Sequence, residues 1–214
     1  MTTYFKYEDR LQSSAVTGKS ESSLTFTAPL CLVQNPLTTT DAEDILSQAL
    51  TDQENYRPSE TMEGTPDARR SILRGALLPA PLEKALVDIL PVVEEILGVE
   101  ANERRVECQS TIHQDGDYFH QHTDIGPGEA ATRKISFVYY LHRTPRRFTG
   151  GRLRMYDTLA CRGQLQAAAS FREIEPNHNT LVFFPATVFH EVLPIKCASK
   201  YLEESRFSYT GWIH

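Results

Sequence analysis

The stretch NTLVFFPATVFHEVLP, residues 179–194, holds an apolar run, a proline turn and the start of a second apolar run that ends at His190. Short runs that are rich in Val, Phe and Thr and bounded by turn residues are typical of β-strands. On both sides of this stretch the same texture predicts strands over residues 106–113, 134–142, 152–156, 180–184 and 206–212. Several short strands at regular spacing predict a sandwich or barrel, and a jelly roll is the natural closed form.

The chain before residue 99 has a helical pattern instead. Apolar residues recur at helical spacing over residues 42–50, and Thr40 with Glu43 predicts the capping box of that helix. A longer apolar stripe covers residues 82–97, and Gly98 is the kind of residue that ends a helix. The sequence therefore predicts a mostly β protein with N-terminal helices, which is an α+β class.

The length of 214 residues suits a single domain. We expect residues 1–98 to form an extended segment with packing helices, and residues 99–214 to form the β core. The net charge of -6 leaves no basic excess for phosphate contacts, so nucleic acid is not an expected partner. No apolar run has the length of a transmembrane helix, so no membrane is expected either.

The cysteines and the N-terminus predict a reduced, cytoplasmic protein. The four cysteines are far apart and form no C-x-x-C pair: Cys31, Cys108, Cys161 and Cys197. The first residues, MTTYFKYEDR, lack the apolar segment of a signal peptide. The sequence leaves the oligomeric state open.

A candidate metal site comes from three residues. His122-Thr-Asp124 has the pattern H-x-D, and residues two apart on a strand point to the same face. His190, on another β-segment, offers a third ligand. Two histidines and one carboxylate on one face of an octahedron form the facial triad of non-heme Fe(II) oxygenases, which leaves three positions open.

A candidate anion site follows in the last predicted strand. A co-substrate that chelates iron through a 2-oxo acid carries a second carboxylate, and this group needs a fixed cation. The planar guanidinium of Arg206 matches a carboxylate with two hydrogen bonds, and Ser208 would share the same strand face. Lys200 is a competing candidate for this role.

Four segments together resemble the Fe(II)/2-oxoglutarate oxygenases of the prolyl 4-hydroxylase-like group. In chain order they are HQDGDYFHQHTD (113–124), FTGGRLRMYD (148–157), NTLVFFPATVFHEVLP (179–194) and SRFSYTGWIH (205–214). The resemblance implies a double-stranded β-helix, a jelly-roll variant, with His122, Asp124 and His190 as iron ligands. It implies that Arg206, assisted by Ser208, binds the distal carboxylate of 2-oxoglutarate.

The same resemblance implies the reactants. They are Fe(2+), 2-oxoglutarate and O2, with ascorbate as a candidate reductant. The expected reaction is hydroxylation of an aliphatic carbon in an amino acid, peptide or protein substrate, with proline as the leading candidate. Members of the group often have a tyrosine that touches 2-oxoglutarate where this chain has His113, so the role of His113 as a co-substrate contact stays open.

Two other classes of protein are alternatives. A cupin-like metal-binding protein without catalysis would need the metal ligands but not Arg206. A zinc hydrolase would need a placed general base, and the chain has no H-E-x-x-H motif.

The remaining polar residues are expected to be structural or peripheral. His120 is a candidate for the mouth of the pocket, whereas His142, His178 and His214 are expected at the surface. The Gly150-Gly151 pair predicts a tight turn or a close backbone approach. The Arg143, Arg146 and Arg147 cluster is expected in a solvated loop, with a local anion site as the alternative.

A long polar loop is predicted over residues 52–71. Long loops in compact domains are often functional lids. Arg69 and Arg70 lie near the end of this loop, where they would either grip a substrate carboxylate or face solvent.

Overall fold

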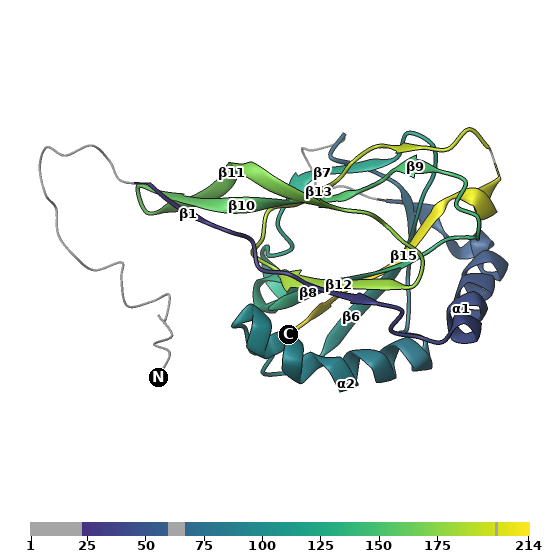
Figure 1. Ribbon diagram of the computed structural model, residues 1–214, viewed down its shortest axis with the longest axis horizontal. Coiled ribbons are helices and arrows are strands. Elements are labelled where there is room, and N and C mark those ends of the chain that lie inside the picture. The colour runs from purple at the N-terminus through teal and green to yellow at the C-terminus, as the bar shows by residue number, and fades with distance from the viewer. Residues whose placement is uncertain (1–22, 60–66, 200) are drawn as a thin grey trace, which may run out of the picture.

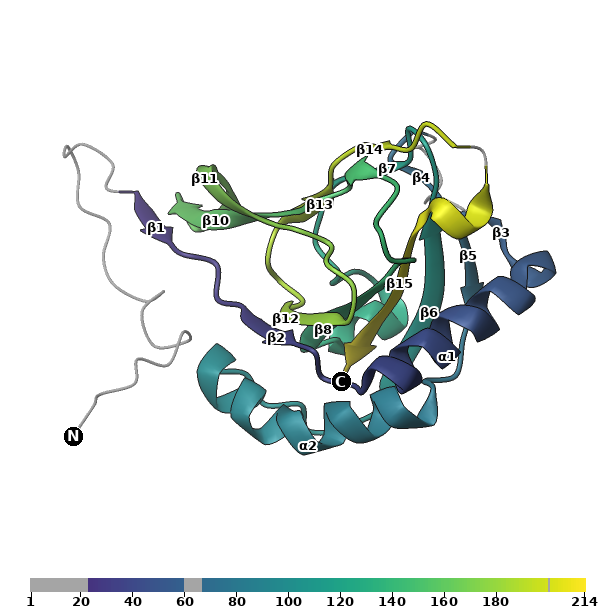
Figure 2. The same cartoon turned by 45° about the vertical axis from the view of Figure 1, so that its right-hand side comes forward.

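The computed structural model describes residues 23–59, 67–199 and 201–214. Two antiparallel sheets face each other, and two α-helices cover the outer side of the larger sheet (Figures 1 and 2). The helices are α1 (Thr39–Thr51) and α2 (Ala80–Leu97). The prediction of a mostly β protein with N-terminal helices is confirmed.

The larger sheet has seven strands and the smaller has six. In spatial order, the larger sheet is β2 (Cys31–Gln34), β12 (Thr180–Pro185), β8 (Ile135–Leu141), β15 (Arg206–Ile213), β6 (Val106–His113), β5 (Ile72–Gly75) and β3 (Arg57–Pro58). The smaller sheet is β1 (Leu24–Phe26), β10 (Leu153–Cys161), β13 (His190–Val192), β7 (Tyr118–His122) and β4 (Arg69–Arg70), with β11 (Gln164–Ile174) also paired to β10. A further pair is formed by β9 (Thr149–Gly150) and β14 (Ile195–Lys196).

The five strands predicted from the sequence match β6, β8, β10, β12 and β15, although β10 is longer than expected. Short strands before residue 98 also join both sheets, because β2 pairs with β12 and β4 pairs with β7. The division of the chain at residue 98 stays a prediction.

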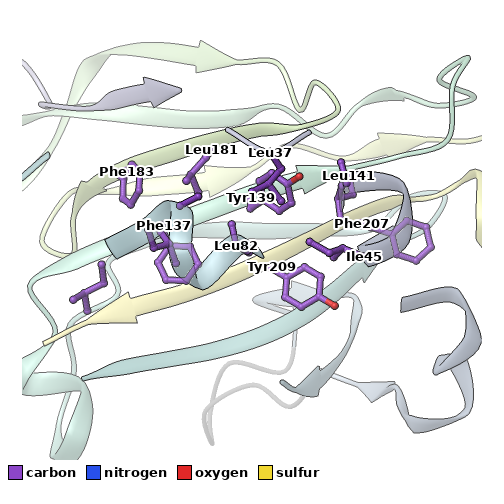
Figure 3. Close-up of a cluster of buried hydrophobic side chains, with 14 of the residues drawn as sticks. Leu37, Ile45, Leu82, Phe137, Tyr139, Leu141, Leu181, Phe183, Phe207 and Tyr209 are labelled. Carbon is purple, nitrogen blue, oxygen red and sulfur yellow. The ribbon is translucent and has the colours of Figure 1, made fainter. Parts of the chain in front are cut away.

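Alternating residues of the larger sheet face two different environments. The side chains that face the helices form the main hydrophobic core, which Figure 3 shows around Phe137, Tyr139, Leu181, Phe183, Phe207 and Tyr209. The residues between them face the smaller sheet. They include Val138 and Tyr140 on β8 and Arg206 and Ser208 on β15. Because side chains alternate along a strand, the same strands build the core on one face and a pocket on the other.

Helix α1 begins two residues earlier than its predicted capping box. Thr38 is the N-cap residue, and its hydroxyl accepts a hydrogen bond from the backbone N–H of Asp41 at 3.1 Å. The prediction of Thr40 with Glu43 was therefore wrong. Leu37, directly before the cap, and Ala42, in the first turn, are both buried in the main core. Apolar residues directly before the cap and in the first turn, both buried in one core, are the arrangement of a hydrophobic staple.

Helix α2 confirms the predicted apolar stripe and its end. Gly98 closes the helix with φ of 65°, a left-handed conformation that suits glycine. Leu82, Leu86, Leu90 and Val93 are buried on one side, against the larger sheet. No helix among residues 23–59, 67–199 and 201–214 is both long and apolar enough to cross a membrane.

The described residues of the predicted loop 52–71 include regular secondary structure. It contains a 3-10 turn (Gln53–Asn55) and the short strands β3 and β4, so a continuous loop was wrong for these parts. Residues 60–66 of this loop, like the N-terminal residues 1–22, lie outside the described residues. Strand β4 is too short to be recognised from period-two alternation, and its pairing with β7 defines it.

Candidate functional site

Two histidines of the predicted triad lie opposite each other on neighbouring strands. His122 on β7 and His190 on β13 are direct antiparallel partners. The carboxylate of Asp124 lies between them, with Oδ1 at 3.6 Å from Nε2 of His122 and Oδ2 at 3.5 Å from Nε2 of His190. Among the described residues these three form the one group of His, Cys, Asp and Glu side chains close enough to hold a metal ion.

Asp124 reaches the site by a different route from the one predicted. Strand β7 ends at His122, so Asp124 does not share a strand face with it. The backbone N–H of Asp124 donates to Ala186 O at 2.9 Å, and Arg133 donates to the carbonyl oxygen of Asp124 at 3.1 Å. Ser136 donates to Oδ2 of the carboxylate at 2.6 Å. These contacts hold the carboxylate in place where strand pairing does not.

Both imidazole rings present Nε2 to the site. His122 Nδ1 lies 2.7 Å from His120 O, and His190 Nδ1 lies 2.9 Å from Val188 O. A ring nitrogen next to a carbonyl carries the proton, so the other nitrogen keeps its lone pair for a metal. Phe119 stacks on His122 with ring centroids 3.6 Å apart, which further restrains that ring.

The protonation states of His122 and Asp124 also suit a metal ion. Burial, and then the neighbouring His190, lower the pKa of His122 to about 3, so its imidazole is neutral at physiological pH. Burial alone would raise the pKa of Asp124, but the two histidines and the Ser136 hydrogen bond hold it below its usual value. Neutral imidazole and ionised carboxylate are the forms that bind a divalent cation.

A pocket between the two sheets joins this group to Arg206. The pocket is lined by all six residues predicted for the site, namely His113, His122, Asp124, His190, Arg206 and Ser208. The Arg206 guanidinium donates to Nδ1 of His113 at 3.0 Å and lies over the Tyr140 ring at 4.7 Å from its centroid. Burial, and then the cations Arg206 and Arg69, lower the pKa of His113 well below its usual value, so His113 is neutral and accepts this hydrogen bond.

Several buried polar atoms beside Arg206 lack a partner among the described residues. They are Nε of Arg206, Nε2 of His113 and the hydroxyl of Tyr140. Buried donors of this kind cost free energy unless a ligand accepts their hydrogen bonds. The residues present therefore fit a carboxylate near Arg206 and a divalent metal at the triad, which are the two groups that the predicted co-substrate and iron would bring.

Tyr140 was not singled out from the sequence, although it lines the pocket beside Arg206. The alternation of strand 134–142 held the signal, because Tyr140 lies two residues after Val138 and four after Ser136 on the same face. Arg69 also lines the pocket, whereas Arg70 is exposed and pairs with Asp117 at 2.7 Å. Lys200, the rival of Arg206, lies outside the described residues.

Of the three histidines that were expected at the surface, two are buried and one is partly buried. His214 is buried, and its Nδ1 lies 2.7 Å from the Thr132 hydroxyl. His142 is buried and His178 is partly buried, and each ring accepts a hydrogen bond from the backbone N–H of the other. Reciprocal bonds of this kind depend on the close approach of two chain segments, which the sequence does not reveal. His120 is exposed and does not line the pocket.

Other local predictions agree with the structure. Gly151 has φ of 65°, and a Cβ there would lie 2.7 Å from the Ile195 side chain and 3.1 Å from Cδ of Arg206. The glycine pair thus permits a close approach beside Arg206. Each arginine of the predicted solvated cluster has a glutamate partner: Arg143 with Glu203, Arg146 with Glu175 and Arg147 with Glu204.

Known proteins share the sequence pattern and the fold. The family model for the 2OG-Fe(II) oxygenase superfamily matches residues 108–214. The chain is 32% identical over 188 residues to an uncharacterized PKHD-type hydroxylase of Synechocystis sp., which covers 85% of this chain and 61% of that protein. The chain thus spans less than two thirds of the length of this relative.

Two solved structures have a similar fold. A prolyl-4-hydroxylase of Pseudomonas putida superposes with a TM-score of 0.61 and 22% identity, over 88% of this chain and 93% of that one. A prolyl hydroxylase of Trichoplax adhaerens, in complex with a hypoxia inducible factor peptide, gives a TM-score of 0.61 and 18% identity over 87% and 84% of the two chains.

Proposed function

Since the chain belongs to the 2OG-Fe(II) oxygenase superfamily, we propose that it is an Fe(II)- and 2-oxoglutarate-dependent dioxygenase that hydroxylates an aliphatic carbon. The observation that carries this proposal is the joining of a His-Asp-His group and a buried arginine in one pocket. We infer that the two facing sheets form the double-stranded β-helix typical of that superfamily.

The proposed ligands of the iron are His122, Asp124 and His190. The neutral imidazole of His122 and the ionised carboxylate of Asp124 support this assignment, as do the carbonyl contacts that orient both rings. Three protein ligands on one face leave room for the co-substrate and O2.

Arg206 is the proposed partner of the distal carboxylate of 2-oxoglutarate, with Ser208 and His113 assisting. His113 takes the place of the tyrosine found in the resembled group, and its tautomer supports this role. Because Nδ1 accepts from Arg206, the proton lies on Nε2, which is free to donate to a carboxylate oxygen. Tyr140 adds a second neutral donor, since burial raises the pKa of its hydroxyl.

When bound, the iron and 2-oxoglutarate supply the oxidising chemistry that inserts an oxygen atom of O2 into a C–H bond. The chain's own contribution is to bind, orient and exclude water. Val138, Leu153 and Val192 give the pocket an apolar wall between the polar groups. This wall strengthens the electrostatic contacts of Arg206 and limits the access of water to the reacting atoms.

The proposed substrate is a peptidyl or free amino acid, with proline as the leading candidate. The fold neighbours named as prolyl hydroxylases support this class. Fold alone does not decide a substrate, because unrelated functions recur on one fold.

A succinate-release assay tests the proposal. Purified protein would receive Fe(II), 2-oxoglutarate, ascorbate and O2 together with a panel of proline-containing peptides and free amino acids. We expect succinate release that depends on one substrate class, with about one Fe(II) bound per chain. Iron binding without any decarboxylation of 2-oxoglutarate would instead support a cupin-like metal-binding protein, the alternative that has no need of a buried Arg206.

A further inference from the structure

Arg69 is a second cation in the same pocket. It lies on β4 directly opposite Phe119 of β7, and its guanidinium lies over the Phe119 ring at 4.8 Å from the centroid. Phe119 in turn stacks on His122, so the guanidinium, the phenyl ring and the proposed iron ligand form one stack. This places Arg69 beside the triad, on the smaller sheet, whereas Arg206 comes from the larger sheet.

The protein partners of Arg69 are neutral. Its Nε donates to the Ser71 hydroxyl at 2.9 Å, and its NH2 group donates to the Thr111 hydroxyl at 3.4 Å. No carboxylate of the described residues lies within ion-pair distance of it, whereas Arg70, the next residue, is paired with Asp117. Burial lowers the pKa of Arg69 to about 10, but the guanidinium keeps its charge at neutral pH.

Counted over the described lining residues and the proposed iron and 2-oxoglutarate, the pocket has an excess of positive charge. The proposed iron brings two positive charges, and Arg69 and Arg206 bring two more. Asp124 removes one and 2-oxoglutarate, a dianion, removes two, while the imidazole of His122 is neutral. One positive charge is left over. A partly buried cation without a counter-charge is costly, so a substrate that places a carboxylate against Arg69 suits the site.

We propose that Arg69 binds a carboxylate of the substrate, so that the substrate is a free amino acid or a chain end that carries its own carboxylate. The inference rests on the proposed function and narrows it. An internal protein residue other than Asp or Glu has no carboxylate, and it would leave Arg69 with only its neutral hydroxyl partners, Ser71 and Thr111, among the described residues. The position of Arg69 beside the triad lets it orient the carbon next to that carboxylate toward the metal.

Binding measured without turnover tests this inference. The protein would be loaded with Fe(II) and 2-oxoglutarate in the absence of O2, and ligand binding followed by the shift in unfolding temperature. The probes are the free L-amino acids including proline, the carboxamides of the same amino acids, and proline peptides that end in a free acid or an amide. Free amino acids and acid-ended peptides form separate arms, which tells the two sources of the carboxylate apart.

We expect a free acid to bind and its amide to bind about 30-fold more weakly or not at all. Arg69→Gln should remove this preference and weaken binding of the acid by about 30-fold or more. In the same Arg69→Gln variant, the affinity for 2-oxoglutarate should change by less than about threefold. Arg70→Gln is the matched control and should leave both affinities unchanged, while Arg69→Lys should retain part of the preference because it keeps the charge.

Four results would overturn the inference. The first is equal binding of acid and amide, and the second is unchanged binding of the acid in Arg69→Gln. The third is no binding of any acid by a chain that binds iron and 2-oxoglutarate. The fourth is a loss of 2-oxoglutarate binding in Arg69→Gln as large as in Arg206→Gln. If the unaltered chain bound neither iron nor 2-oxoglutarate, the proposed function itself would fail, and this inference with it.

Discussion

The two faces of the seven-stranded sheet are built from the same strands, but one face packs the hydrophobic core and the other lines the pocket. The outer face, toward the helices, buries apolar side chains such as Phe137, Phe183 and Phe207. The inner face buries Arg206 and His113, which have unpartnered polar atoms. Burial of the apolar side chains on the outer face stabilises the fold, whereas burial of these polar groups on the inner face costs free energy until a ligand binds. Substitutions on the two faces should therefore separate stability from function.

The largest effect is expected at the proposed metal. His190→Ala should abolish turnover and reduce bound iron from about one per chain to near zero, because two ligands hold Fe(II) poorly. Iron content after anaerobic loading is the measurement. His120→Ala is the control, since His120 is exposed and its ring does not reach the pocket. Full iron binding in His190→Ala would remove that residue from the ligand set.

The next effect concerns the inner face alone. Arg206→Gln should weaken 2-oxoglutarate binding by about 30- to 800-fold, which corresponds to roughly 2–4 kcal/mol for a charge-assisted contact in a partly dry pocket. Iron binding and the unfolding midpoint should change little, because the arginine has no carboxylate partner to lose. Titration calorimetry without O2 measures the affinity.

Two variants accompany that measurement. Arg152→Gln removes an exposed arginine that pairs with Glu175 and Glu173, and it should leave 2-oxoglutarate binding intact. Lys200→Ala tests the rival cation. A loss of affinity in Lys200→Ala together with normal affinity in Arg206→Gln would transfer the role to Lys200.

The outer face should give the opposite result. Phe183→Ala should lower the free energy of unfolding by about 3–5 kcal/mol, because it leaves a cavity in a fully buried core. The fraction that stays folded should bind 2-oxoglutarate with nearly unchanged affinity. Urea unfolding measures the loss, and Phe171→Ala on the exposed side of β11 should cost far less. A large loss of affinity in folded Phe183→Ala would mean that the two faces are not independent.

The smallest effect is a dependence of stability on pH. The pKa of His113 is well below its unfolded value, so below about pH 6.5 the unfolded chain binds a proton that the folded chain does not. Stability should fall as the pH drops, by up to about 1.4 kcal/mol per unit from this group. His113→Gln should reduce the slope of the free energy of unfolding against pH between pH 7 and pH 5. An unchanged slope would show that His113 is protonated in the folded state.

The sequence by itself determined the features that depend on local order along the chain. Short runs of β-branched and aromatic residues between turns predicted the main strands, and the order of His122, Asp124, His190 and Arg206 predicted the candidate site. Helix α1 shows the limit of such reasoning, because three consecutive threonines can each serve as a cap. The buried Leu37 decides in favour of Thr38.

Only the tertiary structure decided which side chains meet across the chain. Asp124 reaches the triad through contacts with Ala186 and Ser136, which belong to distant strands and turns. The Arg206–His113 hydrogen bond and the Arg69–Phe119 stack arise because β15 pairs with β6 and β4 pairs with β7. Strand pairing over long sequence separations depends on the packing of the whole core, and no local pattern encodes it.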